Sequence, residues 1–219
     1  MDYQLQGQVA LISIDDGKAN ALNHNFIDSI NPLLDKAEQE ASALIIHARE
    51  GMFSAGFDLK ELQKGGDQAE ALIEKGMALS TRLFAFPLPV ISACAGHAIG
   101  MGAFILLCSD NRLGTNTEYN VTLPETAIGM PFTPVLMSLI HARIPSCHQT
   151  TAVLQSRAHS PEEAVTAGFL DQIVEADQLL PQAIALAETL TQLPAEFYKT
   201  NKEDLRQGYL KVMRDSLKS

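Results

Sequence analysis

The strongest constraint on the fold is a unit that occurs twice: a short apolar run, a glycine-containing loop and a helical segment. In the first copy, residues 43–48 (ALIIHA) precede the loop REGMFSAGF and a helical start at Asp58. In the second, residues 90–95 (VISACA) precede the loop GHAIGMG and an apolar helix over residues 103–108. Uninterrupted apolar runs of this length are typical of buried parallel strands, which are joined by helical crossovers. The chain is therefore predicted to be α/β.

The flanking segments fit the same class of fold. Residues 9–14 predict a first strand, and apolar residues then recur at helical spacing over residues 26–37. The sequence SPEE at residues 160–163 has the pattern of a capping box with proline in the first turn, so it predicts a helix start. A short strand is expected over residues 170–174, and the tail from residue 181 onward is expected to be helical.

Composition limits what kind of protein this is. The chain has 219 residues, of which 46% are hydrophobic and 19% charged, which favours one globular domain. A net charge of −10 without a Lys/Arg run argues against a nucleic-acid partner. The longest apolar stretch is too short to span a membrane and the N-terminus does not resemble a signal peptide, so a cytoplasmic location is expected. The cysteines lack metal-ligand or CxxC spacing and are expected to be small buried residues: Cys94, Cys108 and Cys147.

The glycines of the two loops admit several explanations. A dinucleotide-binding GxGxxG motif would need a third glycine where Ile105 stands, and no Walker Gly-Lys-Ser/Thr ending occurs. Ser54 is one residue out of step with a GxSxG nucleophile elbow. Two explanations stay open from the residues alone. The glycines allow close-packed turns, or they let two helix N-termini present free N–H groups to one anionic oxygen.

Four segments, in order, resemble the crotonase, or enoyl-CoA hydratase/isomerase, superfamily. MFSAGFDLKEL (residues 52–62) resembles the family's FxAGxDLxE motif, and ANALN (residues 19–23) is similar to its CoA-binding loop. GHAIGMGAFILLCSDNRLG (residues 96–114) resembles the second signature of the family, and LPETAIGM (residues 123–130) resembles the third. Because the order and the separations agree as well, the resemblance covers most of the chain.

This resemblance implies a crotonase-like spiral of ββα units, usually assembled as homotrimers or hexamers. It divides the chain into a core domain over residues 1–190 and a short C-terminal helical extension over residues 191–219. The helical region after the core is expected to be shorter than is typical of the family. The substrate pocket is therefore expected to be more open.

The resemblance also implies an oxyanion hole in which the backbone N–H groups of Phe57 and Met101 hold the carbonyl oxygen of a thioester. The partner is an acyl-CoA, with CoA as part of the substrate, no separate cofactor and no metal. The positions similar to the CoA-binding segments of the family are Lys18, Ala19, Ala21, Ala55, Phe57, Asp58, Leu59 and Lys60. Lys18 and Lys60 are candidates for pairing with the CoA phosphates, and Asp58 is expected to cap a short helix.

The carboxylates decide which reaction the resemblance implies. Hydratases of the family use two glutamates, but the first of these positions is Phe104 here, whereas the second is Glu125. One base beside an oxyanion hole suits a Δ3,Δ2-enoyl-CoA isomerase, in which Glu125 moves a proton between two carbons. Phe104 is expected to exclude water and to raise the pKa of Glu125 by desolvation. Gly100 and Met130 complete the predicted substrate pocket with Phe104.

Two other functions stay open. A different crotonase reaction, such as enoyl-CoA hydration, acyl-CoA decarboxylation or thioester hydrolysis, would use the same oxyanion hole. A non-catalytic acyl-CoA-binding protein would keep the hole but have no productive base. Turnover of a panel of acyl-CoA thioesters separates these functions from isomerisation.

Overall fold

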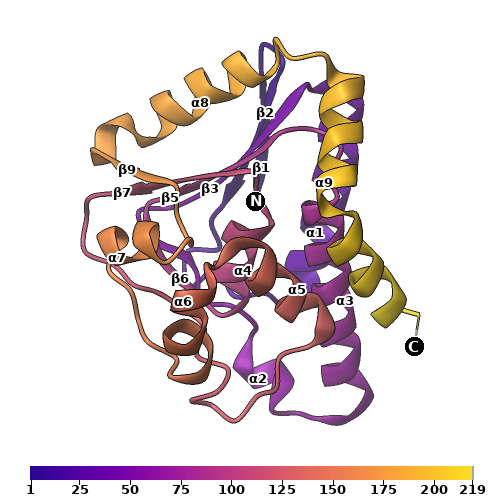
Figure 1. The fold of residues 1–219 in the computed structure, drawn as a ribbon, viewed down its shortest axis with the longest axis vertical. Coiled ribbons are helices and arrows are strands. Elements are labelled where there is room, and N and C mark those ends of the chain that lie inside the picture. Colours follow the sequence, from indigo (N-terminus) through magenta and orange to yellow (C-terminus); the bar gives the residue numbers. More distant parts are fainter. Residues whose placement is uncertain (219) are drawn as a thin grey trace.

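The computed structural model describes residues 1–218 and contains two β-sheets (Figure 1). The larger sheet has six strands in the order β1-β2-β3-β5-β7-β9. β1 pairs antiparallel with β2, and the later pairings in this sheet are parallel. The bounds are β1 Asp2–Gln6, β2 Val9–Ile14, β3 Ala43–Ala48, β5 Val90–Cys94, β7 Asn111–Thr115 and β9 Gln172–Val174. Every strand predicted from the sequence lies in this sheet.

The smaller sheet consists of parallel strands that the sequence analysis did not identify. They are β4 (Gly51–Ser54), β6 (Gly96–Ile99) and β8 (Val121–Thr122), neighbours in that order. The loop predictions for REGMFSAGF and GHAIGMG are therefore wrong over β4 and β6. These strands are short and pair through small residues: a Cβ on Gly96 would lie 2.1 Å from the carbonyl carbon of Gly51. So close an approach of two backbones requires glycine.

Helices follow the strand pairs and produce a repeated unit. The pairs β1–β2, β3–β4, β5–β6 and β7–β8 are followed by α1, by α2 with α3, by α4 and by α5. This order confirms the predicted α/β fold with its ββα units. The helices are α1 His24–Glu40, α2 Leu59–Leu62, α3 Gly66–Phe84, α4 Met101–Cys108, α5 Pro134–Arg143, α6 Ser146–Gln149, α7 Pro161–Thr166, α8 Leu179–Leu190 and α9 Ala195–Ser216, with a π-helical turn at Thr150–Leu154 and a 3₁₀ turn at Ala176–Gln178. No helix within residues 1–218 is long and apolar enough to cross a lipid bilayer.

Helices cover both faces of the large sheet, which explains why β2, β3 and β5 are buried along almost their whole length (Figure 1). α8 covers one face with residues spaced by one helical turn: Leu179, Ala183 and Ala187. They belong to one cluster with alternate strand residues such as Leu11 and Ile45. The intervening strand residues point the other way and pack in the main core with α1, α3 and α4.

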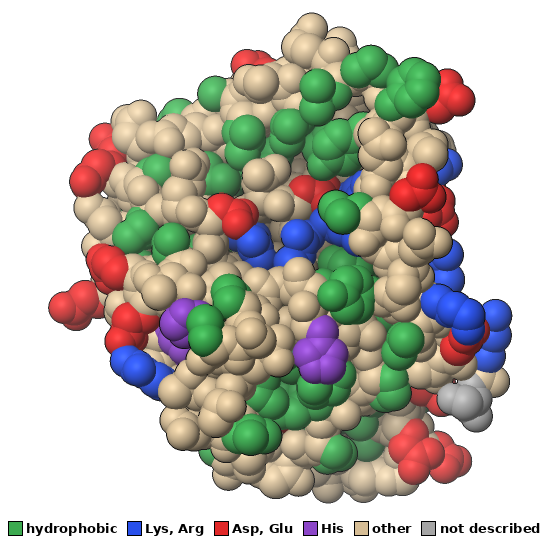
Figure 2. Space-filling view, viewed as in Figure 1, with side chains coloured by type: hydrophobic (Ala, Val, Ile, Leu, Met, Phe, Trp, Pro, Cys, Tyr) green, Lys and Arg blue, Asp and Glu red, His purple; other side chains and the backbone are tan. Residues whose placement is uncertain are grey.

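Several apolar side chains remain on the surface of the C-terminal part of the chain. Leu193, Phe197, Leu205 and Val212 are exposed, Leu205 by 81%. Figure 2 shows apolar groups gathered over α8 and over its connection to α9. Exposed apolar surface of this kind is typical of contacts with another protein chain.

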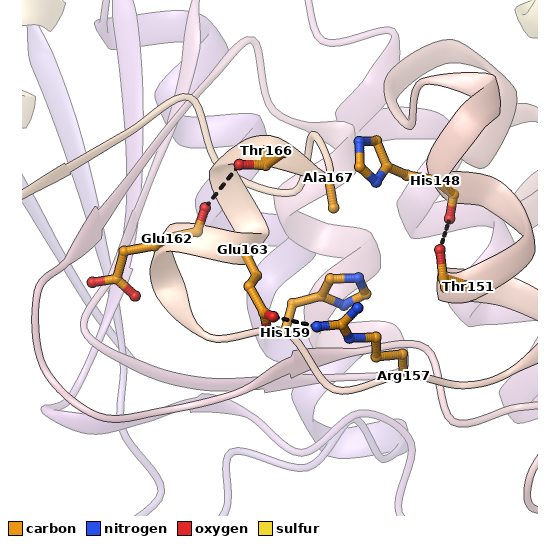
Figure 3. Close-up of a pocket in the computed structure, with 8 residues that line it drawn as sticks. All are labelled: His148, Thr151, Arg157, His159, Glu162, Glu163, Thr166 and Ala167. Atoms are coloured by element: carbon orange, nitrogen blue, oxygen red, sulfur yellow. Dashed lines mark hydrogen bonds and ion pairs between the residues drawn. The ribbon is translucent and has the colours of Figure 1, made fainter.

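The predicted capping box at the start of α7 is confirmed. The Glu163 N–H donates to Ser160 Oγ at 3.3 Å, and the Ser160 N–H donates to Glu163 Oε2 at 3.0 Å. The Glu163 carboxylate also forms an ion pair with Arg157 beside a cavity of about 320 Å³ (Figure 3). Gly168 follows the helix with φ +84°, as expected for the residue that ends it.

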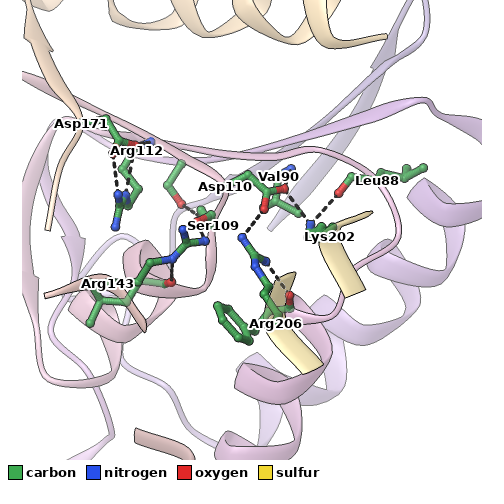
Figure 4. A network of polar contacts seen from close by, with 12 residues as sticks. Leu88, Val90, Ser109, Asp110, Arg112, Arg143, Asp171, Lys202 and Arg206 are labelled. Carbon is green, nitrogen blue, oxygen red and sulfur yellow. Dashed lines mark hydrogen bonds and ion pairs between the residues drawn. The ribbon is translucent and has the colours of Figure 1, made fainter. Parts of the chain in front are cut away.

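A buried carboxylate just before β7 fixes α9 to the core (Figure 4). Lys202 Nζ donates to Asp110 Oδ2 at 2.7 Å, and Arg206 Nη2 donates to Asp110 Oδ1 at 2.5 Å. Burial alone would raise the pKa of Asp110, but Lys202 and Arg206 lower it below its usual value. The predicted C-terminal extension therefore packs on the core through ion pairs. Its last residue, 219, lies outside the described part of the chain.

Candidate active site

Backbone hydrogen bonds join the loop after β2 to the loop after β4. The Ala55 N–H donates to Ala19 O at 2.9 Å, and the Leu22 N–H donates to Gly56 O at 2.7 Å. The Asp58 N–H in turn donates to Leu22 O at 3.0 Å. The structure thus brings together the two segments that the sequence analysis assigned to CoA.

Asn20 organises this pair of loops, and the sequence analysis did not identify it. Its side-chain nitrogen donates to the carbonyl oxygens of Ile14, Met52 and Phe53 at 3.2, 3.1 and 3.2 Å. The Ser54 hydroxyl donates back to Asn20 O at 2.7 Å. Asn20 has φ +50°, a left-handed conformation that Asn adopts more readily than most residues. An Asn between two alanines was the only available sequence signal.

The two strand-to-helix junctions meet at Gly56 and Met101. A Cβ on Gly56 would lie 2.6 Å from Ile99 O and 3.1 Å from Met101 N, so only glycine permits this contact. Gly56 also has φ +82°. Met101 is the first residue of α4, where N–H groups have no intrahelical acceptor. Within residues 1–218, neither the Phe57 N–H nor the Met101 N–H donates a hydrogen bond.

The side chain of Phe57 rests against α3. A Cβ on Gly76 would lie 2.4 Å from Cζ of the Phe57 ring, so the ring occupies a notch that exists because residue 76 has no side chain. This contact links the segment carrying the Phe57 N–H to a long helix of the core. The position of that N–H is thereby determined by two elements, the loop after β2 and α3.

The Glu125 carboxylate lies beside Gly100, at the start of α4. A Cβ on Gly100, the residue before Met101, would lie 3.1 Å from Glu125 Oε1. Glu125 is only 7% exposed, and its buried Oε2 has no hydrogen-bond partner among residues 1–218. Burial raises the pKa of Glu125 to about 7, and no neighbouring charge contributes to that shift. The site therefore contains a carboxylate that is poised to exchange a proton near neutral pH.

The predicted pocket residues lie on α4 with its N-cap and on the turn that carries Glu125. Gly100 is the N-cap of α4, and Phe104 is completely buried one turn further along the helix. The Phe104 ring packs edge-on against Phe132, with centroids 6.3 Å apart. The Met130 N–H donates to Glu125 O at 2.8 Å, which closes the turn that carries the acid. α4, which follows Gly100, therefore contributes only buried apolar residues.

The other predicted CoA-contacting residues line the rim of the paired loops. Lys18 and Lys60 are exposed, as is Leu59. Asp58 accepts a hydrogen bond from the Lys60 N–H at 2.9 Å and is the N-cap of α2, which confirms its expected capping role. Ala21 is partly exposed in the loop that pairs with residues 55–58. Two exposed cationic side chains therefore lie on neighbouring segments, Lys18 on the loop after β2 and Lys60 on α2.

Two further observations concern residues outside this site. Cys94 and Cys108 are buried as predicted, but Cys147 is exposed, so the expectation of three buried cysteines is wrong for that residue. The reason is that Cys147 lies in α6, a four-residue helix without any buried residue. Among residues 1–218, no group of three or more His, Cys, Asp or Glu side chains is arranged to hold a metal ion.

Comparison with known proteins identifies similar sequences among enoyl-CoA hydratases and related proteins. The family model "Enoyl-CoA hydratase/isomerase" matches residues 4–218. A probable enoyl-CoA hydratase of Bacillus subtilis is 33% identical over 126 residues, which cover 56% of this chain and 48% of that protein. The chain thus spans about half the length of that relative.

Solved structures match over nearly the whole chain. An enoyl-CoA hydratase/isomerase family protein from Pseudomonas syringae has a TM-score of 0.95 and 32% identity over 99% of this chain and 94% of its own. An enoyl-CoA isomerase from Mycobacterium tuberculosis has a TM-score of 0.94 and 32% identity over 99% and 95%. A second structure of that protein describes it as a probable enoyl-CoA hydratase. The chain therefore belongs to the enoyl-CoA hydratase/isomerase family and has the crotonase fold.

Proposed function

We propose that the protein isomerises a 3-enoyl-CoA to a trans-2-enoyl-CoA, with Glu125 as the single acid and base. The observation that carries this proposal is one buried carboxylate, with a pKa of about 7, next to two backbone N–H groups that have no acceptor in residues 1–218. The N–H groups of Phe57 and Met101 act as the oxyanion hole. Each such donor typically contributes about 2.7–4 kcal/mol of transition-state stabilisation.

In this reaction Glu125 acts twice. Its carboxylate removes a proton from C2 of the thioester, and the electrons of the broken C–H bond move into the conjugated system and onto the carbonyl oxygen. The oxyanion hole stabilises the dienolate that results. The carboxylic acid then returns the proton to C4, so that the double bond moves from C3–C4 to C2–C3 and no atom is gained or lost.

Phe104 favours isomerisation over hydration. A hydratase has to orient and deprotonate water, and a fully buried phenylalanine offers neither a hydrogen-bond acceptor nor a base. Glu125 also feels no second charged group, as a paired carboxylate would. Hydration remains the second candidate, because most of the named relatives are described as hydratases.

The proposal includes the binding of CoA and the assembly. Lys18 and Lys60 pair with the CoA phosphates at the rim of the site, where flexible ammonium groups suit phosphate. The exposed apolar side chains of α9 and its connection to α8 fit a homotrimer or hexamer, which sedimentation or light scattering would measure. The cytoplasm, where thiols such as Cys147 stay reduced, is the proposed location.

The decisive experiment is a panel of acyl-CoA thioesters incubated with the wild type and with Glu125→Gln. Chromatography coupled to mass spectrometry identifies the products. We expect the wild type to form the trans-2 isomer from a 3-enoyl-CoA. Glu125→Gln should lose at least about 10²-fold in kcat while still binding acyl-CoA. Glu118→Gln, which alters an exposed carboxylate between β7 and β8, is the matched control and should retain the wild-type rate.

Other outcomes would assign other functions. Faster addition of water to a 2-enoyl-CoA than isomerisation of the 3-enoyl-CoA would favour a hydratase. Binding of thioesters without turnover would indicate a non-catalytic protein. Isomerisation in D₂O adds a further criterion, because a single carboxyl group that carries the proton from C2 to C4 should deliver part of the original hydrogen to C4.

A further inference from the structure

No side chain of the described residues orients the Glu125 carboxylate by a hydrogen bond, and the one hydrogen bond that lowers its pKa comes from its own backbone. Its Oε2 is buried without a partner among residues 1–218. The position of the carboxylate therefore depends on the backbone turn that carries it. In this turn the Ile128 N–H donates to Pro124 O at 3.0 Å, and the Met130 N–H donates to Glu125 O at 2.8 Å. Whatever holds the turn in place also holds the acid.

On one side, β8 leads into the turn and pairs with β6. On the other side, residues 150–159, here called the supporting segment, make three hydrogen bonds to both flanks of Glu125. The Thr126 hydroxyl donates to Val153 O at 2.7 Å. The Ala127 N–H donates to Ser156 Oγ at 3.1 Å, and the Thr122 hydroxyl donates to Ser156 O at 3.3 Å. Ser156 thus binds the chain on either side of the acid.

The supporting segment has an unusual backbone that makes these contacts possible. The Gln155 N–H donates to Thr150 O at 3.2 Å, and the Arg157 N–H donates to Thr151 O at 3.1 Å. In an α-helix the Arg157 N–H would bind Val153 O. The π-helical turn ends at Leu154, so Val153 O has no donor within the helix and is free to accept from the Thr126 hydroxyl. Such π-turns frequently occur at functional sites.

Ser156 has a second unusual property, a φ of +49°. Only Ser156 and Asn20 among the non-glycine residues of the described chain have positive φ. Such a conformation costs about 1–3 kcal/mol and persists only where the surroundings enforce it. Here it places the hydroxyl and the carbonyl of one residue against two parts of the Glu125 turn. The two left-handed residues therefore lie beside the two halves of the candidate site.

Part of the supporting segment packs in the core, where Ala152 and Val153 are buried, but its far side does not. It borders the cavity of about 320 Å³ that Figure 3 shows, with His159, Arg157 and α7 on its walls. Directed bonds hold this side of the segment: His159 pairs with Val121 through two backbone hydrogen bonds of 2.9 and 3.0 Å, and Arg157 pairs with Glu163. The support of the turn therefore depends on hydrogen bonds as well as on packing.

We propose that Thr126 and Ser156 are positioning residues that keep the Glu125 carboxylate buried over Gly100 at the depth that the proton transfer requires. This inference rests on the proposed role of Glu125 as the base. Neither hydroxyl contacts the carboxylate; both act through the backbone of the turn. Loosening the turn lets water reach the carboxylate and moves it away from the reacting carbons.

Two substitutions test the inference with little change of shape: Thr126→Val and Ser156→Ala. Each removes one hydrogen bond to the turn. We expect kcat to fall about tenfold, because a misplacement of about 1 Å already weakens catalysis strongly. KM should stay within about twofold, because the groups that bind CoA are untouched. Thr126→Ser, which restores the hydroxyl, should recover the wild-type kcat.

The second expected effect is a change in the pKa of Glu125. This change would not occur if Thr126 and Ser156 only stabilised the fold. The pKa of Glu125, measured from its ¹³C carboxyl signal during a pH titration, should fall from about 7 toward 4.5 in Thr126→Val and Ser156→Ala. Comparison with Glu125→Gln assigns the signal. Thr166→Val and Ser42→Ala remove hydroxyls that bond to Glu162 O and to the Gln8 side chain, far along the chain from the turn, and should change neither kcat nor this pKa.

The two levels of the hypothesis fail separately. If the wild type turns over no thioester but the titration shifts as described, the proposed reaction is wrong and the positioning of Glu125 stands. If the wild type isomerises and Glu125→Gln does not, while Thr126→Val and Ser156→Ala keep the wild-type kcat and pKa, the positioning role is refuted. Equal losses in the two hydroxyl controls would refute it as well.

Discussion

At the scale of single residues, the burial of Glu125 suits proton transfer but lowers the stability of the fold. Glu125 is buried, and its Oε2 lacks a hydrogen bond within the described residues, which are unfavourable conditions for a charged group. The same burial moves its pKa to about 7, where a carboxyl group both takes up and releases protons. A residue selected only for stability would be neutral at this position.

The first prediction is that Glu125→Gln stabilises the fold above neutral pH. The folded protein holds the Glu125 proton up to about pH 7, whereas the unfolded chain releases it near pH 4.5. Stability of the wild type therefore falls as pH rises through this window, because the folded state binds more protons. The variant lacks this loss, so its free energy of unfolding should exceed that of the wild type by about 1–3 kcal/mol at pH 8.

Urea denaturation at pH 4 and pH 8 measures this difference, which should nearly vanish at the lower pH. Glu118→Gln should show no such dependence because Glu118 is exposed. A variant less stable than the wild type at pH 8 would contradict the burial of a titrating carboxylate at this position.

Which residues could be predicted from sequence depended on the kind of signal. Phe57, Met101 and Glu125 stand in recognisable motifs, and the structure brings their segments together, whereas their catalytic roles stay predictions. Asn20 and Ser156 could not be found, because a positive φ depends on the surrounding fold and Asn and Ser are common loop residues.

At the scale of elements, the apolar pattern predicted the large sheet but not the small one. Strands buried on both faces leave a continuous apolar run, as at β3 and β5. β4 and β6 are four residues long each and contain glycine, so neither periodicity nor propensity distinguishes them from loops. Only the contact between distant segments defines them. The candidate site lies where these short strands lead into helices.

The second prediction concerns the packing of α4 on β4. A Cβ on Gly102 would lie 2.3 Å from Ser54 O, so Gly102→Ala should force α4 away from β4 and cost about 1–3 kcal/mol. Because Met101 precedes this residue, activity should fall too. Gly208→Ala is the matched control: it lies in α9 with no atom within 4 Å of the new Cβ, and should stabilise by about 0.5–1 kcal/mol. Thermal unfolding measures the stability of both variants. If Gly102→Ala changed stability in the same way as Gly208→Ala, the packing argument would be refuted.

The third prediction concerns α9. Asp110→Asn leaves Lys202 and Arg206 buried without a carboxylate and should cost about 3–5 kcal/mol. Asp215→Asn removes exposed ion pairs with Lys211 and Lys218, so it should not change the unfolding midpoint. Chemical denaturation compares the two variants. Similar midpoints would show that α9 is held by apolar contacts rather than by this network.

At the scale of the whole molecule, charge opposes the proposed substrate. The chain has a net charge of −10, and CoA is an anion, so long-range repulsion slows their encounter. Lys18 and Lys60 provide local attraction at the rim of the site. Sequence alone indicated the acidic balance and both lysines. That they lie on neighbouring segments, the loop after β2 and α2, is shown only by the hydrogen bonds between Ala55, Ala19 and their neighbours.

The fourth prediction follows from this balance. Lys18→Glu and Lys60→Glu should raise KM for an acyl-CoA severalfold, roughly in line with the loss of a surface charge pair, and leave kcat unchanged. The effect should shrink with added salt, because exposed charges are screened. Lys199→Glu, an exposed change on α9, is the control of equal charge. If KM rose equally in all three variants, the net charge of the protein would be the cause, and the predicted contact of Lys18 and Lys60 with CoA would be wrong.

The anchor of α9 also has a consequence for how the protein is synthesised. Asp110 meets its two cations only through residues that lie 92 and 96 positions later in the sequence. While the nascent chain is still attached to the ribosome without α9, that acid has no counter-ion, and the sheet beside it stays marginal. We therefore expect the sheet beside Asp110 to reach its final stability only after α9 has emerged from the ribosome and supplied Lys202 and Arg206.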